Sequence, residues 1–270
     1  MGKLFKPRSL TLSNGKVVEE EKSNTLLISL ILLTFLIISL RVTGFNTSIL
    51  ARNGRNLMAI LKDLFNPEWE YLPKVIGPTF DTIKMSLFGS FLGALIALPF
   101  AFLASSNMIT SKIINWIFKF LFTLFRTLPT LVIALIATYV FGLGTLAGTV
   151  AIFIFSFAYV GKIMYEEIET QNLGAYEAMI SMGYSKPMAF LKGIIPSIMA
   201  TYISTSLFNF EGNVRYASIL GYVGAGGLGL LINENIGWRD YNRVGTILFA
   251  LVITVFIIEL ISRTIRKKLS

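Results

Sequence analysis

The sequence contains no cysteine and no histidine among its 270 residues. Their absence excludes disulfides, thiol nucleophiles, zinc sites built from Cys and His, and the usual imidazole base. Charge is also scarce, because charged residues make up 14% of the chain and hydrophobic residues 54%. A soluble domain of this composition would expose too much apolar surface. The composition predicts a membrane protein, and we expect no metal site, cofactor or catalytic residue.

The formal charge of +9 does not indicate a nucleic-acid partner. The basic residues form no stripe interleaved with stacking aromatics, as nucleic-acid binding would require. They cluster instead at the ends of apolar blocks, where the positive-inside rule and anionic lipid account for them. Membrane lipid is therefore the expected partner of this charge.

Uninterrupted apolar blocks predict an all-α integral membrane protein with six transmembrane helices. The first lies in residues 23–42, and we expect it to remain as an anchor because no small-x-small cleavage site follows. The second is expected in residues 84–112, where Pro99 would kink the helix. The third and fourth are expected from about 117 to 161, with a turn at 142–144 between them. The fifth and sixth are expected in 193–210 and 244–261.

These crossings predict five parts of the chain and an orientation. They are a cytoplasmic tail at 1–22, the helix at 23–42, an external loop at 43–78, a core at 79–262 with its cytoplasmic loop at 164–192, and a basic cytoplasmic tail at 263–270. Six crossings put both termini on one side, and their basic residues favour the cytoplasm. The external loop opposes this orientation with Arg52, Arg55, Lys62 and Lys74, which three acids partly offset.

A spaced motif lies in the polar loop at 164–192 and just beyond it. It reads Glu177-Ala178-Met179, then Gly183 after three residues, then Gly193-Ile194-Ile195-Pro196 after nine more. This resembles the EAA loop of ABC-importer permeases, with departures at Met179, Gly193 and Ile195. The resemblance implies that Glu177, Ala178, Gly183 and Pro196 couple the chain to a separate ATPase. An isolated Glu-Ala pair would more simply be a solvated loop, but the full spacing favours the coupling element.

A second resemblance is to the phosphonate permease branch of these importers. It is carried by Phe208-Asn209-Phe210-Glu211-Gly212-Asn213-Val214-Arg215 and by Val223-Gly224-Ala225-Gly226-Gly227-Leu228-Gly229. Further support comes from Asn66-Pro67-Glu68, Arg126-Thr127-Leu128-Pro129 and the segment 142–148. The resemblance implies a phosphorus oxyanion as the solute and a bundle of the type I, MetI-like kind.

The glycines Gly224, Gly226, Gly227 and Gly229 also fit G-x-G-x-x-G. A dinucleotide fingerprint needs a strand before it and a helix after it in a soluble βαβ unit, which is not expected here. We interpret these glycines as a gate or as sites of close helix packing. The chain also lacks G-x-x-x-x-G-K-[ST], so any ATPase must be another polypeptide.

Charged residues at membrane depth are costly and usually face a cavity or a partner. Arg126, Glu211, Asn213 and Arg215 are candidates for contact with the solute, because an Arg fork suits an oxyanion. Glu211 and Arg215 are also spaced for a purely structural i,i+4 pair. Lys84 and Lys119 are expected to snorkel to the membrane surface.

The resemblance implies a permease in a bacterial inner membrane, assembled with a second copy or a close paralogue, two ABC ATPase subunits and an external substrate-binding protein. Two alternatives stay open: a permease of the same architecture for another solute such as methionine, and a secondary transporter that needs no ATPase. A membrane-embedded enzyme is less favoured, since no paired acids or nucleophile converge at one depth.

Overall fold

The computed structural model describes residues 9–11, 15, 17–19, 25–45 and 47–269. The chain divides into two units, Met1–Met58 and Ala59–Ser270. The first contains an antiparallel hairpin of β1 (Ser9–Thr11) and β2 (Val17–Glu19), in which Ser9 lies opposite Glu19. It continues into α1 (Thr25–Val42), whose side chains are all exposed. The helix α2 (Thr47–Leu64) spans the boundary between the units.

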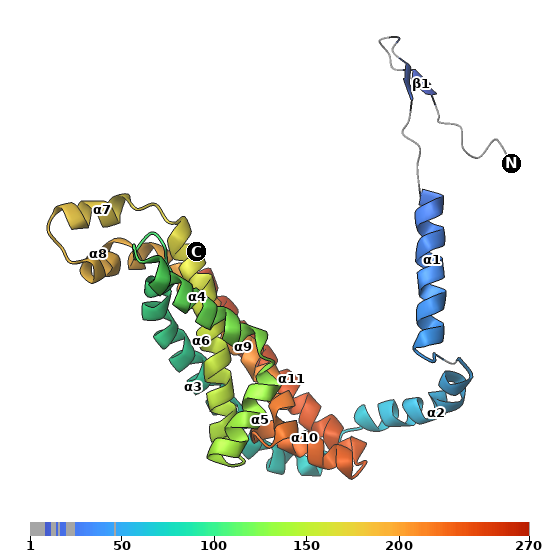
Figure 1. The fold of residues 1–270 in the computed structure, drawn as a ribbon. Coiled ribbons are helices and arrows are strands. Elements are labelled where there is room, and N and C mark those ends of the chain that lie inside the picture. The colour runs from blue at the N-terminus through green and yellow to red at the C-terminus, as the bar shows by residue number, and fades with distance from the viewer. Residues whose placement is uncertain (1–8, 12–14, 16, 20–24, 46, 270) are drawn as a thin grey trace. The chain divides into compact units, whose positions relative to one another are not determined.

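The second unit is a helical bundle (Figure 1). Its elements are η1 (Trp69–Tyr71), α3 (Leu72–Ala104), α4 (Lys112–Thr127), α5 (Thr130–Phe141), α6 (Thr145–Thr170), α7 (Gly174–Ser181), α8 (Lys186–Gly193), α9 (Ile195–Leu220), η2 (Gly221–Val223), α10 (Gly227–Gly237) and α11 (Tyr241–Lys267). The short helices α7 and α8 lie at one end of this bundle, near the C-terminus, and α5 and α10 lie at the other end (Figure 1).

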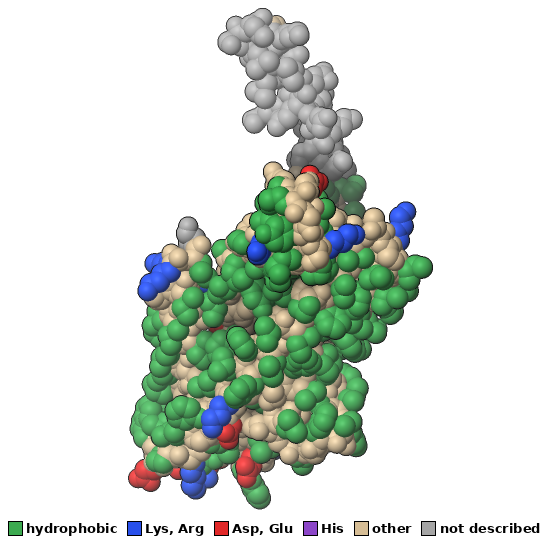
Figure 2. Space-filling model, turned by 90° about the vertical axis from the view of Figure 1, so that its left-hand side faces the viewer, with side chains coloured by type: hydrophobic (Ala, Val, Ile, Leu, Met, Phe, Trp, Pro, Cys, Tyr) green, Lys and Arg blue, Asp and Glu red, His purple; other side chains and the backbone are tan. Residues whose placement is uncertain are grey.

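Among the described residues, four helical segments are each long and apolar enough to cross a membrane: Thr25–Val42, Trp69–Ala104, Thr145–Thr170 and Tyr241–Lys267. Two bent helix pairs raise the count to six when each pair is taken as one span. Figure 2 shows a face that is mostly hydrophobic, with many of its charged side chains toward two opposite ends. The all-α membrane fold predicted from the apolar blocks is confirmed.

Several helix boundaries differ from the predicted ones. The helix α3 begins at Leu72 rather than near residue 84, because its first four turns carry Lys74, Asp81 and Lys84 outside the apolar block. The expected third crossing is broken by 91° between α4 and α5. Leu128 and Pro129 are extended there, with ψ angles of 125° and 131°, as the restriction on a residue before proline favours. The helix α6 continues to Thr170, so residues 164–170 belong to it and not to a loop.

Small residues bring α3 and α6 together. A Cβ atom added at Gly93 would lie 2.7 Å from the carbonyl oxygen of Phe153 and 2.9 Å from the amide nitrogen of Phe157. One at Gly89 would lie 2.8 Å from the carbonyl oxygen of Thr149. The two backbones therefore approach closely, as small residues at an interface of membrane helices allow. We call this contact the α3–α6 seam.

Candidate functional site

The two short helices α7 and α8 form a hairpin whose turn depends on Gly183. The amide of Tyr184 donates to the carbonyl oxygen of Met179 at 3.1 Å, and the amide of Gly183 donates to that of Ile180 at 2.9 Å. These two bonds form a Schellman motif, which closes a helix with a left-handed residue. Gly183 adopts a φ of 89° with no atom near its missing side chain. Its conformation, not crowding, requires glycine at this position.

Gly193 departs from the EAA-loop pattern, which has Ile at this position, and the departure has a steric reason. A Cβ atom there would lie 3.0 Å from both the Cα and the amide nitrogen of Tyr176. Glycine at the end of α8 thus lets α7 cross it at close range. Tyr176 is buried at this crossing, and burial raises the pKa of its phenol, which stays neutral. The hairpin is therefore fixed at two points, the Gly183 turn and the contact of Tyr176 with Gly193.

The outer surface of the hairpin combines one acid with apolar side chains. Glu177 and Ala178 are exposed on α7, and Met182 is 63% exposed beside them. Met188 and Leu191 on α8 are also exposed. Pro196, the fourth residue of the motif, lies apart in the first turn of α9 and is exposed. Apolar groups in a polar, projecting element are typical of a surface that a partner covers.

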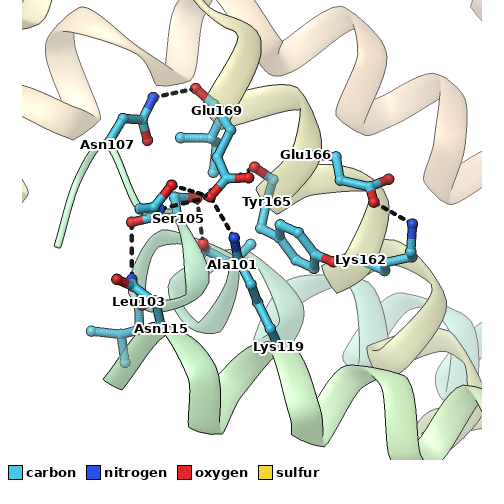
Figure 3. Close-up of polar contacts among 12 residues, drawn as sticks. Ala101, Leu103, Ser105, Asn107, Asn115, Lys119, Lys162, Tyr165, Glu166 and Glu169 are labelled. Atoms are coloured by element: carbon cyan, nitrogen blue, oxygen red, sulfur yellow. Dashed lines mark hydrogen bonds and ion pairs between the residues drawn. The ribbon is translucent and has the colours of Figure 1, made fainter. Parts of the chain in front are cut away.

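A polar clamp links the C-terminal end of α6, which leads into this hairpin, to α4 and to the connection between α3 and α4. Oε1 of Glu169 accepts hydrogen bonds from the amide of Ser106 at 2.8 Å, its hydroxyl at 2.6 Å and Nζ of Lys119 at 2.7 Å. Lys119 also lies 5.1 Å from the ring centre of Tyr165. Figure 3 shows Glu169 facing Lys119 across the gap between α6 and α4. We define Ser106, Lys119 and Glu169 as the clamp; Lys119 is thus an ion-pair partner rather than a side chain in open solvent.

The interior of the bundle contains a chain of hydrogen bonds among α3, α6 and α9. Nδ2 of Asn213 donates to Oγ of Ser90 at 2.8 Å and to Oγ of Ser156 at 2.9 Å. Asn209 donates to the same Ser156 oxygen at 2.8 Å. Asn213 is buried to 1% exposure. Its side chain therefore connects helices of one protomer, and contact with a solute stays a prediction for it.

Glu211 is a buried carboxylate held by two arginines. Its Oε1 lies 3.3 Å from Nη2 of Arg215 and its Oε2 lies 3.4 Å from Nη1 of Arg266. The side chains of Glu211, Arg215 and Arg266 are 6%, 52% and 25% exposed. The first pair has the predicted i,i+4 spacing. The second joins α9 to α11 and cannot be read from spacing, because the partners are 55 residues apart.

Arg126 is not part of this group. It is exposed in the last turn of α4, where a cation favours the helix dipole. In the described part of the chain no ion pair to Arg126 is found.

The glycine run forms the turn between α9 and α10. Gly224, Gly226 and Gly227 all have left-handed φ angles, of 77°, 78° and 67°. Gly229 instead has no room for a side chain, because the carbonyl of Ser218 occupies that space. The carbonyl of Gly224 accepts from the amide of Gly144 at 2.8 Å, which joins this turn to the one before α6. The run has no strand before it, and its role as a gate stays a prediction.

No group of three or more acidic, His or Cys side chains that could hold a metal ion occurs among the described residues.

Three comparisons place these features among known proteins. The profile of the family described as "Binding-protein-dependent transport system inner membrane component" matches residues 89–270. A phosphate-import permease protein, PhnE of Mycolicibacterium smegmatis, is 26% identical over 231 residues, which cover 86% of this chain but only 43% of that protein. A putative phosphite transport system permease protein, HtxC of Stutzerimonas stutzeri, is 26% identical over 238 residues, or 88% of this chain and 84% of the relative.

A shorter relative and a solved structure are also transport proteins of this kind. The putative cryptic phosphonate transport system permease protein PhnE2 of Escherichia coli is 32% identical over 117 residues, covering 43% of this chain and 96% of that protein. An inward-facing structure of the MetNI methionine ABC transporter superposes with a TM-score of 0.63 at 22% identity, covering 73% of this chain and 96% of the matched one. That likeness shows the fold alone.

Proposed function

Because the chain belongs to the family of binding-protein-dependent transport system inner membrane components, we propose that it forms the translocation pathway of an ABC importer for a phosphorus oxyanion. The chain is a multi-pass membrane protein of the permease type. Phosphonate and phosphite are the proposed solutes, and phosphate is a third. Their support is the similarity to relatives named as permeases for phosphate, phosphite and phosphonate, of which the putative phosphite transport permease aligns over 88% of this chain.

The observation that carries the proposed coupling is the α7–α8 hairpin. A permease without a nucleotide site needs a stiff element through which a separate motor can act. The hairpin is fixed by the Gly183 turn and by the contact of Tyr176 with Gly193. It presents Glu177 beside exposed apolar side chains. We propose that an ABC ATPase subunit docks on this surface.

The proposed assembly contains two copies of the chain, or the chain and a close paralogue, with one ATPase docked on each. An external binding protein would deliver the solute, and ATP-driven closure of the ATPases would open the path by rigid-body movement between two states. The hairpin and both termini would then lie in the cytoplasm, and the membrane would be the inner membrane of a bacterium. A methionine importer has only a similarity of fold in its favour.

The test of coupling is co-purification of the ATPase with the permease from native membranes. We expect Glu177→Arg to abolish co-purification while the permease still inserts at its normal level, because the change reverses an exposed charge on the docking surface. Glu234→Arg is the matched control, since Glu234 is also exposed but lies on α10 at the other end of the bundle. Uptake by the permease reconstituted alone, driven by an ion gradient, would refute the proposal in favour of a secondary transporter.

A further inference from the structure

One face of α9 carries polar side chains along its membrane-spanning length. Ser204 and Thr205 follow Thr201 by three and four residues, so they lie on this face of the helix with it. The same spacing continues through Phe208 to Glu211 and Arg215. A lipid-facing helix surface gains nothing from three hydroxyls and an ion pair. This stripe therefore suits an aqueous path better than lipid.

The three hydroxyls are not used by the helix itself. Ser and Thr side chains in a helix commonly donate to the carbonyl three or four residues earlier. Ser197 and Ser206 do so in α9, at 2.7 Å and 2.8 Å. In the part of the chain that the structure describes, the hydroxyls of Thr201, Ser204 and Thr205 make no hydrogen bond. All three are half-buried and remain available as donors.

Arg266 on α11 faces the same place. Two adjoining hollows, of about 240 Å³ and 280 Å³, are both lined by Ser204, Thr205 and Arg266. Thr201 lines the second hollow, and Phe208 lines the first. A cation from one helix and hydroxyl donors from another therefore line the same open hollow.

Arg266 is the charged residue that lines these hollows, and the ion-pair group behind it is not balanced in charge. Arg215 and Arg266 contribute two positive charges and Glu211 one negative charge, which leaves +1 in the group. The Glu211–Arg266 contact of 3.4 Å is longer than a strong charge-assisted hydrogen bond, which measures about 2.7–2.9 Å. A guanidinium has five N–H donors. The bond to Glu211 is the one that the Arg266 side chain makes among the described residues.

We propose that Arg266, Ser204 and Thr205 form a subsite for a tetrahedral phosphorus oxyanion during its passage through the permease. Guanidinium and hydroxyl donors match such an anion in charge and in hydrogen-bond direction. Glu211 holds Arg266 toward the subsite and prevents the anion from binding too tightly to leave. The subsite deepens the function proposed above and rests on it.

The experiment is uptake by the complete transporter, permease with ATPase and binding protein, in proteoliposomes supplied with phosphite, methylphosphonate or inorganic phosphate. Arg266→Gln should lower kcat/KM for uptake about tenfold or more, because it removes a charge-assisted contact. Arg266→Lys should lose less, since it keeps the charge. Arg263→Gln is the matched control on α11, where Arg263 is exposed and lines neither hollow, and it should transport as the unchanged protein does.

A second variant keeps the proposal testable if Arg266→Gln fails to fold. The double change Ser204→Ala with Thr205→Val keeps Glu211 and both arginines, and should raise KM several-fold at an unchanged membrane level. Ser197→Ala removes a hydroxyl that is bonded within α9, and should leave KM unchanged. A KM in the double variant equal to that of the unchanged protein would overturn the subsite but leave the proposed function intact. Failure of the unchanged transporter to take up any of the three anions would overturn both.

A lipid phosphate has the same chemistry as the proposed ligand, so the vesicles are made with and without anionic lipid. An equal loss on Arg266→Gln in both kinds of vesicle supports a subsite for the transported anion. A loss confined to vesicles that contain anionic lipid would assign the site to a headgroup and overturn the proposal.

Discussion

The α3–α6 seam allows a sharp test of the packing, through the substitution Gly93→Ala. The added methyl would begin 2.7 Å from the backbone oxygen of Phe153, whereas ordinary contact starts at 3.4 Å, so the helices must part by 0.7 Å (3.4 minus 2.7). Backbone atoms cannot rotate away as a side chain can. Overpacking costs about 1–3 kcal/mol, and we expect the upper part of that range here.

The control is Gly212→Ala in α9, where no atom lies within 4 Å of the added methyl. Both substitutions gain the same helix propensity, about 1 kcal/mol, so it cancels in their difference. We therefore expect Gly93→Ala to be about 2–3 kcal/mol less stable than Gly212→Ala. Unfolding by SDS in mixed micelles, followed by circular dichroism, measures this difference. Equal stability of the two variants would show that the helices do not approach at Gly93 as described.

Three further outcomes are expected. Gly183→Ala should cost about 1–2 kcal/mol through its left-handed backbone alone, seen as weaker co-purification of the ATPase at a normal membrane level. Asn213→Ala should destabilise the bundle by about 1–2 kcal/mol in the same SDS assay, since it strands Ser90; no change would mean that the buried hydrogen bonds contribute nothing. Glu169→Gln weakens the clamp, and should therefore slow uptake and lower the free energy of unfolding by about 1–2 kcal/mol. Glu166→Gln alters only an exposed ion pair with Lys162, and should change neither uptake nor stability.

The sequence predicted an all-α fold and six membrane spans, which is the count reached when each bent helix pair is one span, because bilayer thickness and apolar length are directly related. It did not predict α2 or α10. The first is amphipathic, with polar residues throughout, and the second has only 11 residues behind a glycine run. It also placed the start of α3 too late, since a helix can continue past the apolar block into water, and charge marks the end of the block rather than of the helix.

Of the candidate site, the sequence predicted the local motifs but not the contacts between distant helices. The EAA-like spacing led to Glu177 and Gly183 because those residues are close in the chain and their turn is local. The i,i+4 pair of Glu211 with Arg215 was readable for the same cause. Arg266 was placed in a cytoplasmic tail, since nothing local shows that α11 returns it to α9. The unpaired hydroxyls of α9 could have been suspected from their helical spacing alone.

The α3–α6 seam also limits which helices can move relative to one another during transport. Where the backbones meet at Gly89 and Gly93 no side chain separates them, so we expect α3 and α6 to move as one body while other distances change during transport. Spectroscopic labels on exposed positions of these two helices would then serve as an internal ruler that reads the same in every state. The chain has no cysteine of its own, so each label attached through an introduced thiol would report from one known place.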